Sequence, residues 1–164
     1  MKLSRYSTLV STLLILAGCV QVSSDVAFFG RPCKTTKSQD LAGIDWNRAR
    51  QINLRIRQGA FSPVFIGLTQ GAPYRLMIEN ADDKRHVFRA MEFFDSVAVS
   101  DVRVISGPGA GTNMGAACSG AIAIAPGTIT EARFVSIRDG VYEFDNNPLL
   151  LSFAMAGSAG GFIV

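Results

Sequence analysis

Short runs in which apolar and polar residues alternate constrain this chain more than any other feature of its sequence. In the run at 51–57 the apolar residues are Ile52, Leu54 and Ile56, and the residues between them are polar. Side chains of a β-strand point alternately to opposite faces, so this period of two predicts a strand with one buried face. Similar short runs follow, separated by turn-forming residues. The sequence therefore predicts an all-β fold in which about eight strands form a Greek-key β-sandwich.

The remaining strands are expected where apolar residues recur along the rest of the chain. These runs lie at 64–68, 74–78, 86–88, 94–104, 121–125, 130–137, 141–144 and 161–164. The residues expected to line the core are Ile52, Leu54, Ile56, Tyr74, Leu76, Ile78, Phe134, Tyr142, Phe144 and Ile163. Asp139-Gly140 is a strong hairpin signal. The glycine-rich stretch 106–115 lacks the Gly-Lys-Ser/Thr of a phosphate loop and a surrounding βαβ pattern, which favours a surface loop.

The N-terminus has the pattern of a secretory signal. Lys2 and Arg5 give a positive start, and the apolar stretch that follows is far shorter than the roughly 20 residues of a spanning helix. It ends in Leu16-Ala17-Gly18-Cys19, which resembles a bacterial lipobox. The resemblance implies that residues 1–18 are removed and that Cys19 carries a lipid, which anchors the chain to a membrane at the periplasmic face. The alternative is a plain signal peptide with an incidental cysteine.

Val20, the residue after Cys19, indicates which membrane the lipidated chain would reach. A residue other than Asp after the lipidated cysteine resembles the default signal for the outer rather than the inner membrane of a Gram-negative envelope.

The expected organisation is a signal peptide at 1–18, a lipidated tether with an irregular segment at 19–49, and one domain at 50–164. Without Lys2 and Arg5 the formal charge of +3 falls to +1. A nearly neutral domain gives no basis for nucleic-acid binding.

Two cysteines remain if Cys19 carries lipid. Cys33 and Cys118 would share an oxidising compartment, and such a pair predicts a disulfide. The bridge would close a loop of about 85 residues. Two separate buried thiols are the alternative. A metal role for the pair has less support, since no Cys-x-x-Cys motif or neighbouring histidine accompanies either residue.

Several motifs share their order and spacing with one known family. They are Phe61-Ser62-Pro63, Gly71-Ala72-Pro73-Tyr74, Asn80 through His86-Val87-Phe88, Glu92-Phe93-Phe94, Pro126-Gly127, Glu131 through Phe134, Gly140-Val141-Tyr142-Glu143-Phe144 and Gly161-Phe162-Ile163-Val164. Together they make residues 50–164 resemble a cupredoxin-like domain, closest to the periplasmic domains associated with copper proteins and with iron-uptake lipoproteins. The resemblance implies a two-sheet sandwich and, in the usual family member, a copper site at one end of it.

The ligands of a blue-copper site are mostly missing from this chain. Such a site needs two imidazoles, a thiolate and a weak axial ligand. His86 matches the first histidine of the family pattern and is the only histidine of the chain. After the Gly-x-Tyr-x-Phe strand the family carries a cysteine, a histidine and a methionine, whereas residues 145–155 contain no cysteine and only Met155 matches. We therefore predict that the protein forms no blue-copper centre.

His86 is still the first candidate for a metal ligand, with Met91, Glu92 or Met155 as its partners. The alternative is an ordinary turn or strand histidine. We expect the carboxylates of Asp82 and Asp83, which lie in a turn, to be solvated. No Gly-x-Ser-x-Gly elbow or other catalytic constellation is present, so we expect no enzyme activity.

Two classes of function remain. The first is a non-enzymatic binding or interaction module without a cofactor, with an envelope protein as its partner. The second is a protein that handles copper or another metal through a reduced site around His86.

Overall fold

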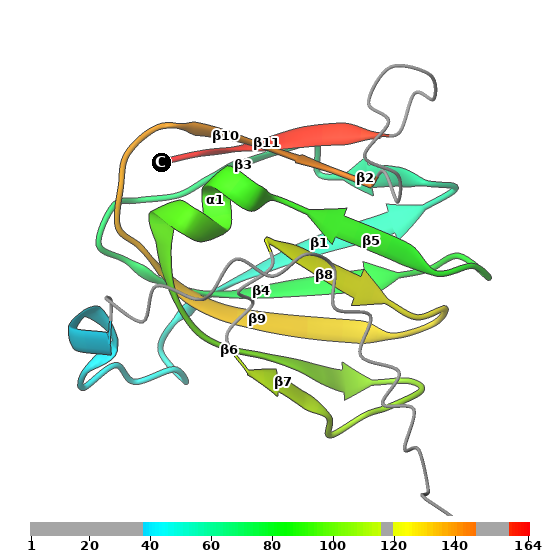
Figure 1. Ribbon diagram of the computed structural model, residues 1–164, viewed down its shortest axis with the longest axis horizontal. Helices are drawn as coiled ribbons and strands as arrows, with labels where there is room; N and C mark the ends of the chain where they lie inside the picture. Colours follow the sequence, from blue (N-terminus) through cyan, green and yellow to red (C-terminus); the bar gives the residue numbers. More distant parts are fainter. Residues whose placement is uncertain (1–37, 116–119, 147–157) are drawn as a thin grey trace, which may run out of the picture.

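The computed structural model describes residues 38–115, 120–146 and 158–164, and these form a two-sheet β-sandwich (Figure 1). The larger sheet has the strand order β2 (Ala60–Ser62), β1 (Arg50–Arg57), β4 (Pro73–Asn80), β9 (Ile129–Ser136), β6 (Val97–Ser106), β7 (Asn113–Gly115). The smaller sheet has the order β3 (Phe65–Gly67), β11 (Ala159–Ile163), β10 (Val141–Asp145), β5 (His86–Arg89), β8 (Ala121–Ile124). The pairs β1–β4 and β3–β11 are parallel, and the other pairs are antiparallel. The predicted all-β sandwich is confirmed.

The alternating runs bury the faces that their period predicts. β4 shows the pattern most completely, because every second residue from Tyr74 to Asn80 is buried. The predicted core residues that are fully buried are Leu54, Ile56, Tyr74, Leu76, Ile78, Phe134 and Phe144. Ile52 and Tyr142 are partly buried and pack against this core.

The prediction that Ile163 lies in the core is wrong, because the buried face of its strand is shifted by one residue. Ile163 is 49% exposed, and its neighbour Phe162 is fully buried instead. The inward face of β11 consists of Gly160 and Phe162, and a Cβ at Gly160 would lie only 2.5 Å from the Phe144 ring. The missing side chain at Gly160 makes room for the Phe144 ring of the neighbouring strand β10. Because side chains alternate along a strand, Phe162 points inward like Gly160, and Ile163 points outward.

The start of the run at 94–104 is helical and not extended. Helix α1 (Met91–Ser96) precedes β6, and both Phe93 and Phe94 are buried. The Phe93 ring stacks on Phe162 at a centroid distance of 3.9 Å. The adjacent pair therefore packs into the core from a helical turn, which a period of two could not predict.

Asp139-Gly140 is not the turn of a hairpin, contrary to expectation. It joins β9 of the larger sheet to β10 of the smaller one, so the chain crosses between layers here. β9 is already paired with β4 on one side and with β6 on the other, which leaves no edge for β10. The glycine-rich stretch instead contains a hairpin, since β7 pairs with β6 across the loop at 107–112.

The segment before β1 packs on the larger sheet. A 3₁₀ turn, η1 (Ser38–Leu41), contacts β6 and β9, and the Trp46 ring lies 6.0 Å from the Arg133 guanidinium carbon.

Cys19, Cys33, Cys118 and Met155 lie outside the described residues, so the lipid attachment, the disulfide and the methionine ligand stay predictions. Within the described part of the chain, no helix is long and apolar enough to cross a membrane.

Candidate functional site

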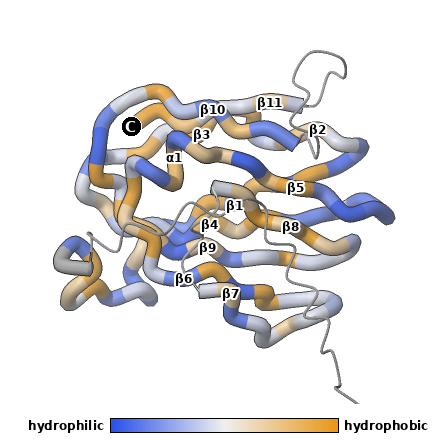
Figure 2. Tube along the Cα trace, in the orientation of Figure 1, coloured by the Kyte–Doolittle hydropathy of each residue, from blue (hydrophilic) through white to orange (hydrophobic). Residues whose placement is uncertain are grey.

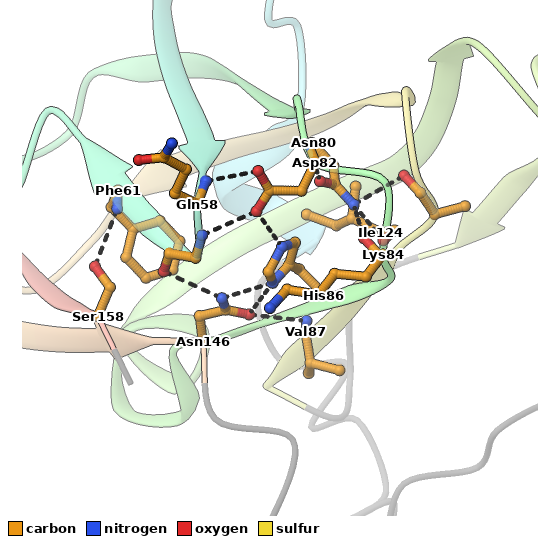
Figure 3. A network of polar contacts seen from close by, with 12 residues as sticks. Gln58, Phe61, Asn80, Asp82, Lys84, His86, Val87, Ile124, Asn146 and Ser158 are labelled. Atoms are coloured by element: carbon orange, nitrogen blue, oxygen red, sulfur yellow. Dashed lines mark hydrogen bonds and ion pairs between the residues drawn. The ribbon is translucent and has the colours of Figure 1, made fainter. Parts of the chain in front are cut away.

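His86 is held in a buried polar network at one end of the sandwich (Figure 3). It begins β5, and only 5% of its surface is exposed. Its Nε2 lies 2.7 Å from Asp82 Oδ2, and its Nδ1 lies 2.7 Å from Asn146 Nδ2 and 3.0 Å from Asn146 Oδ1. This pattern fits an imidazole that donates its Nε2–H to the carboxylate and accepts an amide N–H at Nδ1. Both ring nitrogens thus have protein partners.

Asp82 lies in the turn between β4 and β5, a hydrophilic stretch at the right of Figure 2, yet its side chain is only 10% exposed. The carboxylate accepts the backbone N–H of Gln58 at 2.6 Å and that of Gly59 at 2.9 Å. These are the two turn residues of the β1–β2 hairpin, and both have positive φ. Successive N–H groups in this conformation form a small anion-binding concavity. The expectation of a solvated carboxylate at Asp82 is therefore wrong.

These contacts change the acidity of Asp82. The backbone N–H of Gly59, followed by that of Gln58 and by His86, holds the pKa of the Asp82 carboxyl below its ordinary value, against the opposing effect of burial. Hydrogen bonds to the charged form favour that form. Asp82 is thus an anionic acceptor that fixes the orientation of the His86 ring.

Asn80 holds this turn in place from the end of β4. Its Nδ2 lies within 3.1 Å of the carbonyl oxygens of Lys84, Ile124 and Ala125, and its Oδ1 accepts the backbone N–H of Asp82. A side chain that accepts an N–H two residues on is the usual Asx turn. Asn80 thereby ties the β4–β5 turn to the end of β8 and positions Asp82.

Asn146 comes directly after β10, in the segment where the family pattern carries its cysteine. Its Nδ2 faces His86 Nδ1 and also donates to the Gly59 carbonyl at 3.3 Å. Its Oδ1 accepts the Val87 backbone N–H at 3.3 Å. An amide thus occupies the place beside His86 where the resemblance implies a thiolate.

Two of the other predicted metal ligands, Met91 and Glu92, are not brought to His86, and Met155 lies outside the described residues. Met91 and Glu92 begin α1, beyond the opposite end of β5, and five residues of nearly extended chain span about 16 Å. Met91 is 51% exposed and packs beside Gly120. Among the described residues no group of three or more His, Cys, Asp and Glu could hold a metal ion. His86 therefore lies among hydrogen-bond partners, apart from Met91 and Glu92.

A second buried polar cluster lies on the outer face of the larger sheet. The Glu131 carboxylate is completely buried, and the Nε atoms of Arg75 and Arg103 each lie 2.6 Å from it. Arg133 Nε lies 3.3 Å from the same carboxylate and 4.0 Å from Asp101. The sequence analysis did not predict this cluster. Its only trace in the sequence is that β4, β6 and β9 each carry arginine or carboxylate residues at positions that alternate with core residues.

Comparison with known proteins finds structural neighbours but no sequence relatives. No protein family model and no curated protein matches the chain. Copper nitrite reductase from Nitrosomonas europaea is similar over 73% of this chain and 50% of its own length, with a TM-score of 0.49 and 10% identity. McoA multicopper oxidase from Aquifex aeolicus is similar over 73% of this chain and 30% of its own, with a TM-score of 0.49 and 13% identity.

Auracyanin B is a third neighbour, similar over 74% of this chain and 92% of its own length, with a TM-score of 0.45 and 14% identity. The neighbours are cupredoxin-like, and this chain spans half or less of the first two. The fold assignment for this chain rests on its own strands, described above.

Proposed function

We propose that this protein is a non-enzymatic interaction module built on a cupredoxin-like sandwich, anchored by a lipid on Cys19 at the periplasmic face of the outer membrane. The observation that carries the proposal is the hydrogen-bonded pair of His86 and Asn146. The pair occupies the end of the sandwich where the family resemblance implies copper ligands. A neutral amide is a poor substitute for the thiolate on which a blue-copper centre depends.

The surrounding contacts support a structural role for His86. Asp82 satisfies Nε2, and Asn146 satisfies Nδ1 while also contacting Gly59 and Val87. A metal ion at Nδ1 would have to displace the Asn146 amide and break its contacts to two other elements. Buried polar groups that are fully paired in this way stabilise one arrangement of the chain.

Metal titration of the purified full chain tests the proposal. One equivalent of Cu(II) should produce no intense thiolate-to-copper absorption in the wild type. Asn146→Cys should place a thiol beside His86, and Co(II), which a thiol does not reduce, should then give a new thiolate charge-transfer band. Asn53→Cys is the matched control, because it adds an exposed thiol on β1 without a neighbouring histidine. A blue wild-type protein that loses its colour in His86→Ala would contradict the proposal.

Lipid labelling tests the anchor separately. Metabolic labelling with palmitate should mark the wild-type chain and not Cys19→Ala, and only the wild type should fractionate with the outer membrane. Equal labelling of the two proteins would contradict lipidation at Cys19.

A copper-handling role is the second candidate, and one observation favours it. Metal-bound histidines usually donate their other N–H to a carboxylate, as His86 does to Asp82. A Cu(I) site would then use Nδ1 after Asn146 moves away, with soft thioether ligands preferred. Competition with a chromophoric Cu(I) chelator should show stoichiometric binding that His86→Gln abolishes if this role is correct, and no binding above the His86→Gln variant if it is not.

A further inference from the structure

The outer face of the smaller sheet carries an apolar surface at one edge. Phe65 of β3 is 67% exposed, Val141 of β10 is 69% exposed, and Ile163 of β11 is 49% exposed. These three strands are neighbours in the order β3, β11, β10. The Phe65 ring lies over Gly161, where a Cβ would be 3.5 Å from the ring. We call Phe65, Val141 and Ile163 the edge patch.

β3 is also an edge strand with accessible main-chain groups. Val64 accepts the Gly161 N–H, and Leu68 donates to Ile163, so the even-numbered residues of this segment face β11. Because successive residues of a strand direct their N–H and C=O to opposite sides, those of Phe65 and Gly67 point away from the sheet. Gly67 is exposed and has no side chain, so its exposure is that of its backbone. Such an edge is a template for another strand.

One usual protection of an edge strand, a charged residue on the strand, is missing from β3, although the strand is short and Pro63 precedes it. Natural sheets block edges with charged residues, especially lysine. The chain from Gln58 to Tyr74 contains no charged residue, although Arg57 and Arg75 flank it directly. The other edge of the same sheet, β8, directs only alanines outward. The edge patch is therefore the place in the smaller sheet where an uncharged edge and large exposed apolar side chains coincide.

We propose that β3 pairs with β3 of a second copy of this chain, antiparallel and centred on Ile66. In that register Phe65 lies opposite Gly67 of the second copy, so a bulky ring meets a residue without a side chain. Both residues direct their N–H and C=O to the shared edge, which allows four backbone hydrogen bonds. The uncharged segments bring no like charges together. The two smaller sheets then become one continuous sheet, and both edge patches lie on the same face of it.

The second copy fits this surface better than an unrelated peptide, because the Phe65–Gly67 complementarity occurs twice in a twofold arrangement. Since β3 has three residues, the buried area is at the low end for specific complexes, and the dimer is weak and dependent on concentration. The inference does not depend on whether His86 binds copper.

Sedimentation of the full chain in a non-ionic detergent tests this assembly. The average mass of the sedimenting protein should rise from that of one chain to that of two as the protein concentration increases from about 1 µM to about 1 mM. Phe65→Lys removes the ring and adds a like charge to both copies, and should weaken association at least about tenfold. Met114→Lys is the matched control, because Met114 is exposed on β7 at an edge of the other sheet, and it should dimerise like the wild type.

Disulfide trapping tests the register in the membrane fraction of cells. Directly opposed residues of a hydrogen-bonded pair lie about 5.5 Å apart at Cα, within reach of a disulfide. The double variant Phe65→Cys/Gly67→Cys should therefore give a covalent dimer on mild oxidation, far more than either single variant. A wild type that stays monomeric throughout the concentration range, or Phe65→Lys that dimerises normally while still folded, would overturn the proposal. So would a monomeric protein that binds an extended apolar peptide at β3.

Discussion

Two carboxylates in this protein, one partly and one completely shielded from solvent, are stabilised by different kinds of donors. Asp82 lies in a turn and accepts two backbone N–H groups together with His86. Glu131 lies in the middle of β9, the strand between β4 and β6, and three arginines surround it. One carboxylate is thus held mainly by the main chain and the other by side chains.

The secondary structure around each carboxylate explains the difference. A strand with neighbours on both sides uses its backbone N–H groups in the ladder, so a carboxylate on β9 finds donors only on side chains of its own and the adjacent strands. The β1–β2 turn has N–H groups that no ladder uses, and Asp82 accepts them. Buried charge on a sheet face therefore requires cations from the sequence, whereas buried charge at a turn can be stabilised by backbone geometry.

Glu131→Gln should have the largest effect. The substitution keeps the shape of the side chain but leaves three arginines around a neutral group. Removing one partner of a buried ion pair costs about 3–5 kcal/mol of unfolding free energy, which urea denaturation can measure. Glu79→Gln is the matched control, because Glu79 pairs with Arg55 at an exposed site on the same face and should lose less than about 1 kcal/mol. Equal losses in both variants would contradict the distinction between buried and exposed carboxylates.

Asn80→Ala should rank second. Its amide contacts the carbonyl oxygens of Lys84, Ile124 and Ala125, and these lose that donor in the variant. Unsatisfied buried acceptors cost about 1–3 kcal/mol, again measurable by urea denaturation. Asn53→Ala removes an exposed amide from β1 and should change stability by less than about 0.5 kcal/mol. If the two variants unfold at the same urea concentration, Asn80 does not hold the turn.

Asp82→Asn should show a smaller loss that depends on pH. The folded pKa of Asp82 lies below its ordinary value of 3.8, so the folded state favours the carboxylate. Its contribution is complete above the unfolded pKa and is lost as pH falls through the folded pKa. The stability gap between wild type and variant should be constant above about pH 5 and should close on acidification. Thermal unfolding from neutral to acidic pH measures this gap, with exposed Asp83→Asn as control; a gap that persists in strong acid rejects the role assigned to Asp82.

Gln58→Asn should give the smallest effect, a gain. Gln58 has a φ of +53° in the two-residue turn that supplies an N–H to Asp82. Asn tolerates this conformation better than Gln, and Asn-Gly is the preferred sequence for such a hairpin turn. The gain should be a few tenths to about 1 kcal/mol in urea denaturation. Gln51→Asn, within strand β1, should give no gain; a loss at position 58 would mean that the Gln side chain itself stabilises the turn.

The sequence by itself determined the β class, the buried face of most strands and the shortage of copper ligands. Alternation encodes the direction of each side chain relative to its own strand, so Leu76 and Phe134 could be assigned to the core without knowing their neighbours. Counting residue types after Phe144 was enough to predict that a second histidine and a thiolate are missing there. The same method failed at Phe94, which lies in a helical turn and not in a strand, and at Ile163, which points outward from its strand.

Only the tertiary structure decided which polar groups meet. His86 and Asn146 are 60 residues apart in sequence, and Glu131 is 56 residues from Arg75 and 28 from Arg103. Period and turn signals describe neighbours along the chain, but they do not specify strand order or which sheet each strand joins. Those choices depend on how all the apolar faces are buried together, and this is why Asp82 looked solvated in sequence and proved to be the hydrogen-bond partner of His86.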